Sequence, residues 1–219
     1  ANLSPHEQND ILNSYGSYLG TQDHIRRLER MMGDKQYTAS RALAPRIGNG
    51  YPQLVEARKA LQEVKPGVSS EISRIPSGLL KDTGLMLSRL QWRHQNNEDA
   101  GALEILASAP PAGQTTDPSG WWKERHIMAR RMMEQGRYRD AYRLAAAHGL
   151  PNEGSDFAAA EFLAGFLALR RVNDPHAAFG HFEKLYNYTT TPISKARGAY
   201  WAGRAAEALN NREVALQWY

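Results

Sequence analysis

Apolar residues along this chain recur with the spacing of α-helices rather than that of β-strands. No stretch of six residues alternates apolar and polar side chains with the β-branched enrichment typical of a strand. Helical stripes instead run through 25–32, 54–61, 85–92 and 103–106. Short segments rich in glycine, proline or asparagine separate these stripes. The pattern therefore predicts an all-α chain.

The second half of the chain contains a repeat over 125–145, 161–182 and 199–219. In each copy a polar turn separates two helical stripes, with one small residue in the middle of the first stripe and another early in the second. These small residues are Ala129 and Ala141, Gly165 and Ala178, and Gly203 and Ala215. Two helices approach within about 8 to 10 Å only where the contact residues are small. The six positions are therefore predicted to be helix crossings.

One helical hairpin cannot bury its apolar face alone and must stack on the next. The repeat thus predicts one continuous α-superhelical domain, a solenoid array of antiparallel helix hairpins that is tetratricopeptide-like. We expect degenerate hairpins over 1–110, a loop over 111–120 and regular hairpin repeats over 121–219. Because the last stripe is still in phase at residue 219, we expect that the chain is truncated and that the parent protein continues.

Composition narrows the possible functions. The 219 residues include 42% hydrophobic residues and no cysteine, which leaves no disulfide, zinc–thiolate site or thiol nucleophile. The net charge of +4 is modest, and no basic stripe with interleaved aromatic residues predicts nucleic-acid binding. No window of 18 apolar residues predicts a transmembrane segment, and the first residues do not have the pattern of a signal peptide.

Catalytic and cofactor motifs are not found in the sequence. There is no HExxH, glycine-rich phosphate loop or GxSxG motif, so we predict no metal and no cofactor. The seven histidines are interpreted as surface or capping residues. Neighbouring acidic residues, such as Glu153 and Asp156, lie at turns, where they are predicted to cap helices, with Ser155 or Asp156 as the cap of the following helix. We expect no acidic residue in the apolar surroundings that raise the pKa of a catalytic acid.

Five segments, taken together and in order, resemble the soluble lytic transglycosylases of Gram-negative bacteria. They are 15–32, 54–62, 120–150, 160–186 and 191–209, and the pairing of "WWKER" with "ARGAYWAGRAAEAL" is the most specific feature. The resemblance implies a periplasmic enzyme that cleaves peptidoglycan between N-acetylmuramic acid and N-acetylglucosamine. It implies a 1,6-anhydromuramic product, no metal, and an α-superhelical region that precedes a lysozyme-like catalytic domain.

The sequence departs from this family at the catalytic motifs. The Glu-Ser, Gly-Leu-Met-Gln and Ala-Tyr-Asn motifs are missing, and "GLM" at 84–86 is followed by Leu87. No catalytic residue is therefore carried over. The resemblance implies a non-catalytic scaffold whose partners are a downstream catalytic domain and, weakly, peptidoglycan glycan strands.

Basic and aromatic residues near the start of the regular repeats are candidate ligand contacts. Arginines could pair with the carboxylates of peptide stems, and tryptophans could stack on sugar faces. The candidates are Trp121, Trp122, Arg125, Arg130, Arg131, Arg137 and Arg139. The alternative is that the arginines form a solvated helix face and the tryptophans pack internally. A rival function is a tetratricopeptide-like adaptor that binds a protein or peptide partner.

Overall fold

The computed structural model describes residues 5–111 and 113–219 of the chain. Helix accounts for 76% of the chain, and the described residues contain no strand, so the all-α prediction is confirmed. Contacts divide the chain into two compact units, one ending at Glu98 and the other running from Asp99 to Tyr219. The expected N-terminal array extended to residue 110, whereas the first helix after Glu98 belongs to the C-terminal unit.

The N-terminal unit is built from six α-helices and two short 3₁₀ turns within its described residues. These are α1 (Pro5–Tyr15), η1 (Gly16–Tyr18), α2 (Thr21–Gly33), α3 (Tyr37–Ile47), α4 (Tyr51–Gln62), α5 (Val68–Ser73), η2 (Ser77–Leu79) and α6 (Thr83–Gln95). The predicted stripes supply the core, since Leu28 and Met32 of α2 and Leu54 and Leu61 of α4 are fully buried. Helix α4 packs against both α3 and α6.

A buried ion pair joins three helices of the N-terminal unit. Arg58 of α4 donates from Nη1 to Oε1 of Glu29 at 2.5 Å and from Nη2 to Oε2 at 3.0 Å. Its Nε also donates to the hydroxyl of Ser88, which in turn donates to the carbonyl of Gly84. A Cβ atom at Gly84 would collide with both charged side chains. Gly84, the first residue of the "GLM" sequence, is therefore a packing residue.

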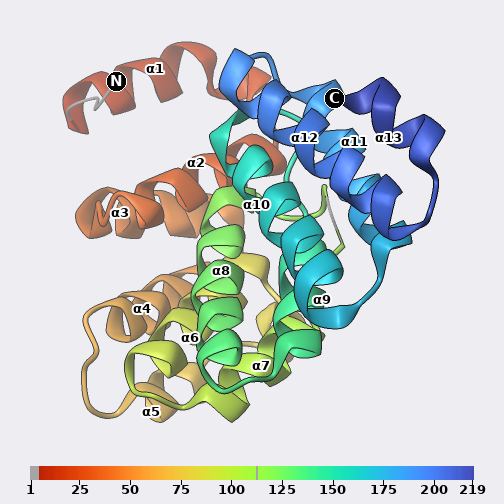
Figure 1. The fold of residues 1–219 in the computed structure, drawn as a ribbon. Coiled ribbons are helices and arrows are strands. Elements are labelled where there is room, and N and C mark those ends of the chain that lie inside the picture. Colours follow the sequence, from red (N-terminus) through yellow and green to blue (C-terminus); the bar gives the residue numbers. More distant parts are fainter. Residues whose placement is uncertain (1–4, 112) are drawn as a thin grey trace. The chain divides into compact units, whose positions relative to one another are not determined.

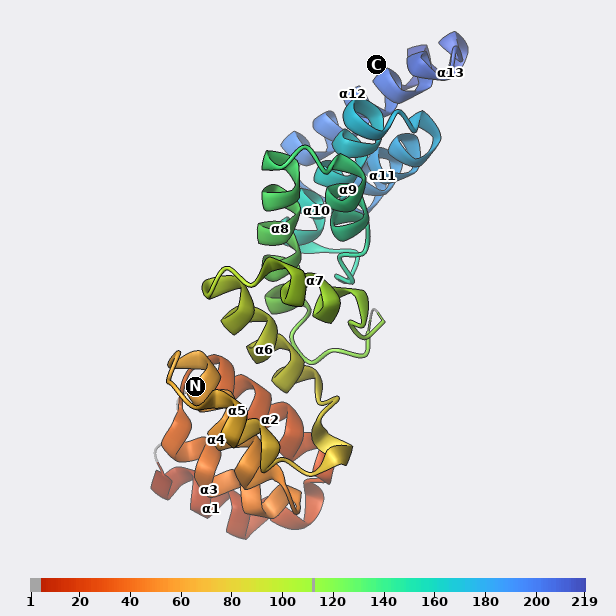
Figure 2. The ribbon, with the colours of Figure 1, turned by 90° about the horizontal axis from the view of Figure 1, so that it is seen from below.

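The C-terminal unit consists of helical hairpins. Its elements are α7 (Asp99–Ala107), α8 (Pro118–Glu134), α9 (Tyr138–Ala146), α10 (Gly154–Leu167), the π-helical turn η3 (Ala168–Val172), α11 (Pro175–Tyr188), α12 (Pro192–Ala208) and α13 (Arg212–Trp218). The pairs α8/α9, α10/α11 and α12/α13 lie side by side in both ribbon views (Figures 1 and 2). Helix α7 ends at Ala107 and α8 begins at Pro118, whereas the loop was expected over 111–120.

Three helices of this unit have the same N-terminal arrangement, a capping side chain followed by proline. The side chains of Asp117, Asp174 and Thr191 each accept a hydrogen bond from the backbone N–H three residues later, at 2.8, 3.0 and 3.3 Å. The next residue is proline in each case, which has no N–H to leave unpaired in the first turn. At α10 the predicted cap is wrong, because the N-cap is Glu153 and its side chain makes no capping hydrogen bond.

All six small residues singled out in the repeats are buried in the structure. The four alanines, Ala129, Ala141, Ala178 and Ala215, are at most 2% exposed. A Cβ atom at Gly165 would lie 2.7 Å from the ring of Phe182 on α11. At Gly203 it would lie 2.6 Å from the ring of Tyr219, which follows α13. Each glycine thus admits an aromatic ring from the second half of its own hairpin.

A further close approach occurs between consecutive hairpins. At Gly198 of α12, a Cβ atom would lie 2.8 Å from the backbone nitrogen of Tyr186 and 3.1 Å from the carbonyl oxygen of Phe182, both on α11. The aromatic rings fill the space around this contact, and Trp201 stacks on Phe182 with ring centres 5.8 Å apart. The helices α11 and α12 are therefore held together by a backbone-to-backbone contact with rings beside it.

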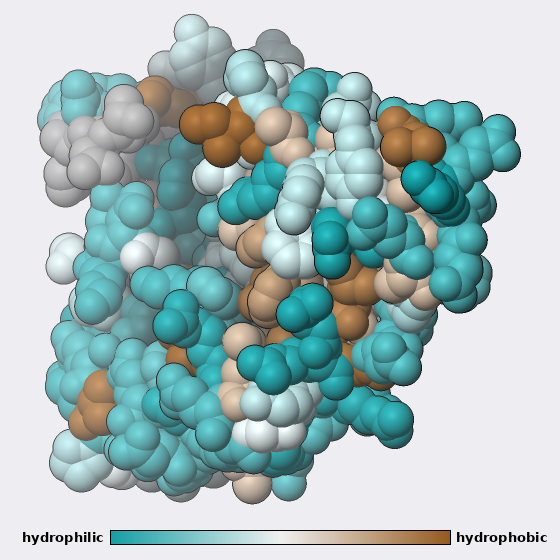
Figure 3. Space-filling model, viewed as in Figure 1, coloured by the Kyte–Doolittle hydropathy of each residue, from teal (hydrophilic) through white to brown (hydrophobic). Residues whose placement is uncertain are grey.

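The surface of the molecule is mostly hydrophilic on the face drawn in Figure 3, and apolar side chains reach it only over limited patches. Ile193 and Leu216 are among the large apolar side chains that remain exposed, at 81% and 66%. No helix in the described part of the chain is both long enough and apolar enough to cross a membrane.

Candidate functional site

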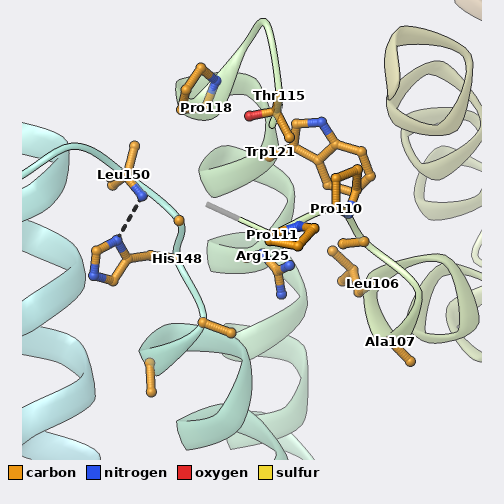
Figure 4. Close-up of a pocket in the computed structure, with 14 residues that line it drawn as sticks. Leu106, Ala107, Pro110, Pro111, Thr115, Pro118, Trp121, Arg125, His148 and Leu150 are labelled. Atoms are coloured by element: carbon orange, nitrogen blue, oxygen red, sulfur yellow. Dashed lines mark hydrogen bonds between the residues drawn. The ribbon is translucent and has the colours of Figure 1, made fainter. Parts of the chain in front are cut away.

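A cavity of about 460 Å³ lies within the C-terminal unit, beside the first half of α8. Trp121 and Arg125 of α8 line one side of it. Its other sides are lined by the loop that contains Pro110 and Pro111 and by the segment 146–150, which begins at the last residue of α9. Figure 4 shows the two α8 side chains between these segments. The volume is within the range of small-molecule sites, about 300 to 1,000 Å³.

Arg125 is the charged residue of this cavity. It is only 8% exposed, and burial lowers the pKa of its guanidinium. No hydrogen-bond acceptor or carboxylate in the described part of the chain pairs with that guanidinium. A buried charge without a partner is costly, because no protein dipole replaces the lost water. The cavity thus contains a positive charge that no acidic residue in its described lining balances.

His148 connects the cavity to a second feature, a charge cluster around the buried Glu161 that also contains His148, His181 and the exposed Lys184. The backbone N–H of Leu150 donates to Nδ1 of His148 at 3.0 Å, so Nδ1 carries no proton and Nε2 carries it. Nε2 then donates to Oε1 of Glu161 at 3.2 Å. Both nitrogens of His148 are therefore used inside the protein.

Glu161 of α10 is the centre of this cluster and is only 2% exposed. Its other oxygen, Oε2, lies 2.5 Å from Nδ1 of His181, and Nζ of Lys184 lies 4.0 Å from Oε1. Burial alone would raise the pKa of Glu161, but the hydrogen bonds from His148 and His181 outweigh burial and lower the pKa to about 2. Glu161 is therefore ionised at neutral pH and fixed by its partners.

The structure separates the ligand contacts proposed from the sequence. Trp121 and Arg125 meet at the cavity, whereas Trp122 does not line it. Trp122 packs in a buried cluster with Leu150 and Phe157, and its ring is stacked 5.2 Å from that of His126. Arg130 and Arg139 are exposed. Arg131 pairs with Asp99, and Arg137 pairs with Asp140 at 2.8 Å. These four arginines do not line the cavity.

One expectation from the sequence is wrong for this region, and the burial of two acidic residues was not predicted. Glu124 and Glu161 are 3% and 2% exposed, but Glu161 does not have the raised pKa of a catalytic acid. His148 is buried and His181 is mostly covered, and both are hydrogen-bonding partners of Glu161 rather than surface or capping residues. The one available signal of the buried Glu161 was the run "AAAEFLAG", because a single charge inside an otherwise apolar helix must find a partner when it lies on the buried face.

Metal binding has no support in the described residues, where no group of three or more His, Asp or Glu side chains could hold an ion. Comparisons with protein-family models, with curated proteins and with solved structures found no match to this chain.

Proposed function

We propose that this chain is the non-catalytic helical scaffold of a peptidoglycan lytic transglycosylase and acts in the periplasm. The observation that carries the proposal is the ordered set of segments that resemble this family, above all 120–150 and 191–209. The first segment covers α8, with its two buried tryptophans, and the second covers α12, with two buried glycines. These four buried residues of the resembling segments are packing residues, which supports the role of a scaffold.

The chemistry of Glu161 favours a scaffold over a hydrolytic or lytic centre. A glycosidic general acid must be protonated near neutral pH, which needs a raised pKa. The two histidines do the opposite, because they lower the pKa of Glu161 to about 2. This carboxylate is therefore suited to holding α10, α11 and the segment after α9 together.

A second candidate function is a tetratricopeptide-like adaptor that binds a protein or peptide. The observation that favours it is the cavity beside α8, because a buried arginine in an apolar recess can bind a carboxylate of a partner. The adaptor would need no catalytic domain elsewhere in the protein. The two candidates therefore differ in what the complete gene product does to peptidoglycan.

The test compares the 219-residue chain with the complete gene product on purified peptidoglycan sacculi. We expect 1,6-anhydromuropeptides, detected by mass spectrometry, from the complete product and none from the 219-residue chain. Anhydro products from the 219-residue chain would refute its non-catalytic role. Their absence from the complete product would favour the adaptor.

Binding of the chain to sacculi is a separate measurement, made by pull-down over a salt series. We expect weak binding that fades as salt rises. A net charge of +4 spread over a helical array gives only modest attraction, and the Debye length at physiological salt is about 8 Å.

A further inference from the structure

The cavity beside α8 has the composition of a site for a small organic anion. Its charged group is Arg125, which is more than nine-tenths buried and lines the cavity wall. None of the described residues that line the cavity is acidic, so the protein itself supplies no counter-ion there. His148 also lines the cavity, but both of its ring nitrogens are already engaged, by Leu150 and by Glu161.

The remaining wall of the cavity is largely apolar. The cavity that Arg125 lines is also lined by apolar residues (Figure 4). They are Leu106 of α7, Pro110 and Pro111 of the loop, Trp121 of α8, and Leu150. Binding is favoured when such a wall covers an apolar group of the ligand. It is disfavoured when the wall removes water from a strongly hydrated group. A ligand that fits both parts has one anionic end and one apolar body.

We propose that this cavity binds a small monocarboxylate with an apolar body, with the carboxylate on Arg125 and the body against Trp121 and the two prolines. A guanidinium presents two parallel N–H donors that match the two oxygens of a carboxylate. One buried positive charge balances one negative charge, so a singly charged carboxylate suits the site better than doubly charged phosphate. The inference does not depend on whether the chain is a transglycosylase scaffold or an adaptor.

Phenylacetate is a suitable probe, because it combines a carboxylate with a flat apolar ring, and phenylacetamide is its uncharged counterpart of the same shape. Binding to the 219-residue chain is measured by calorimetry and by ¹H–¹⁵N NMR. We expect phenylacetate to bind and to shift the indole N–H of Trp121 and the amide of Leu150. Phenylacetamide should bind about 10- to 100-fold more weakly, the range for a hydrogen bond to a charged group. Inorganic phosphate should bind more weakly than phenylacetate.

The variant Arg125→Met keeps the bulk of the side chain and removes its charge. We expect it to weaken phenylacetate binding by about 10- to 100-fold and to bring the two probes to similar affinity. Its thermal midpoint without ligand should not fall, because the variant removes a buried charge that has no partner. The matched control is Arg130→Met, an exposed arginine on the same helix, which should leave the affinity unchanged.

Four results would overturn the proposal, and the first three concern phenylacetate. The first is no binding of phenylacetate, the second is equal binding of phenylacetate and phenylacetamide, and the third is unchanged affinity in the Arg125→Met chain. The comparison of the two probes uses only the natural sequence, so it decides the question even if the variant does not fold. Stronger binding of phosphate than of phenylacetate would replace the carboxylate with an inorganic oxyanion and would also refute the proposal.

Discussion

Replacing Glu161 by glutamine tests the buried charge cluster most directly. Glutamine has the same shape but stays neutral, so it mimics a permanently protonated carboxyl. The folded protein holds the pKa of Glu161 at about 2, compared with an ordinary value of 4.5. At 1.36 kcal/mol per pKa unit, ionised Glu161 contributes about 3 kcal/mol to stability at neutral pH. We expect Glu161→Gln to lose about that amount at pH 7.

The pH dependence of this difference is the sharper part of the test. Because the folded-state pKa lies below the unfolded one, the contribution is fully present above about pH 5 and is lost as the pH falls toward 2. The natural chain should therefore lose about 2 kcal/mol between pH 5 and pH 3 through Glu161 alone. The glutamine variant has no such proton to bind, so the gap between the two chains should narrow by that amount.

Urea unfolding at pH 7, 5, 4 and 3, followed by tryptophan fluorescence, measures this gap. Four of the five tryptophans lie in the C-terminal unit, so the signal reports mainly on the part that contains Glu161. The control is Glu183→Gln, an exposed carboxylate on α11, which should change stability little at any of these pH values. A gap between natural chain and Glu161→Gln that stays constant from pH 5 to pH 3 would refute the reasoning.

Three further predictions concern the backbone, and thermal melts check each of them. Gly198→Ala should destabilise the chain by about 1 to 3 kcal/mol, because the new Cβ meets the backbone of α11. Gly180→Ala has open space around it and should stabilise the chain by about 0.5 to 1 kcal/mol, so equal effects of the two variants would contradict this reasoning. Gly203→Leu should also cost about 1 to 3 kcal/mol, and an unchanged melt would show that the half-exposed Tyr219 ring simply moves away. Val64→Gly should stabilise by about 1 kcal/mol, because a β-branched residue at φ 51° is strained there, and a lower melting temperature would contradict that.

The helices and the crossings inside the hairpins follow from local sequence, whereas contacts between hairpins do not. Gly165 and Gly203 stand out because they recur at similar positions in successive copies. Gly198 has the same physical role, but it packs against the preceding hairpin, and the repeat pattern gives no sign of that. The placement of one hairpin on the next depends on which face of each helix meets its neighbour, and this information is spread over many residues.

In the candidate site, too, the sequence predicts which residues are candidates but not which of them the fold brings together. The sequence marks five arginines of one amphipathic region as equal candidates, yet only Arg125 is buried beside a cavity. The cavity depends on a proline-bearing loop and on the segment after α9, both of which are brought to α8 by folding. Glu161 was missed for a related reason, because its partners His148 and His181 are 13 and 20 residues away on other elements.

The π-helical turn η3 explains an irregularity in the repeat. Twelve residues separate the two crossing positions of the first and third hairpins, but thirteen separate Gly165 from Ala178. The π-helical turn lies between these two positions, and a π-helix closes each hydrogen bond over one more residue than an α-helix does. The extra residue is therefore absorbed within a single turn, and both crossing residues remain buried. The consequence is a tolerance in the spacing of this hairpin, because its two crossing residues stay buried although they lie one residue further apart than in the other two hairpins.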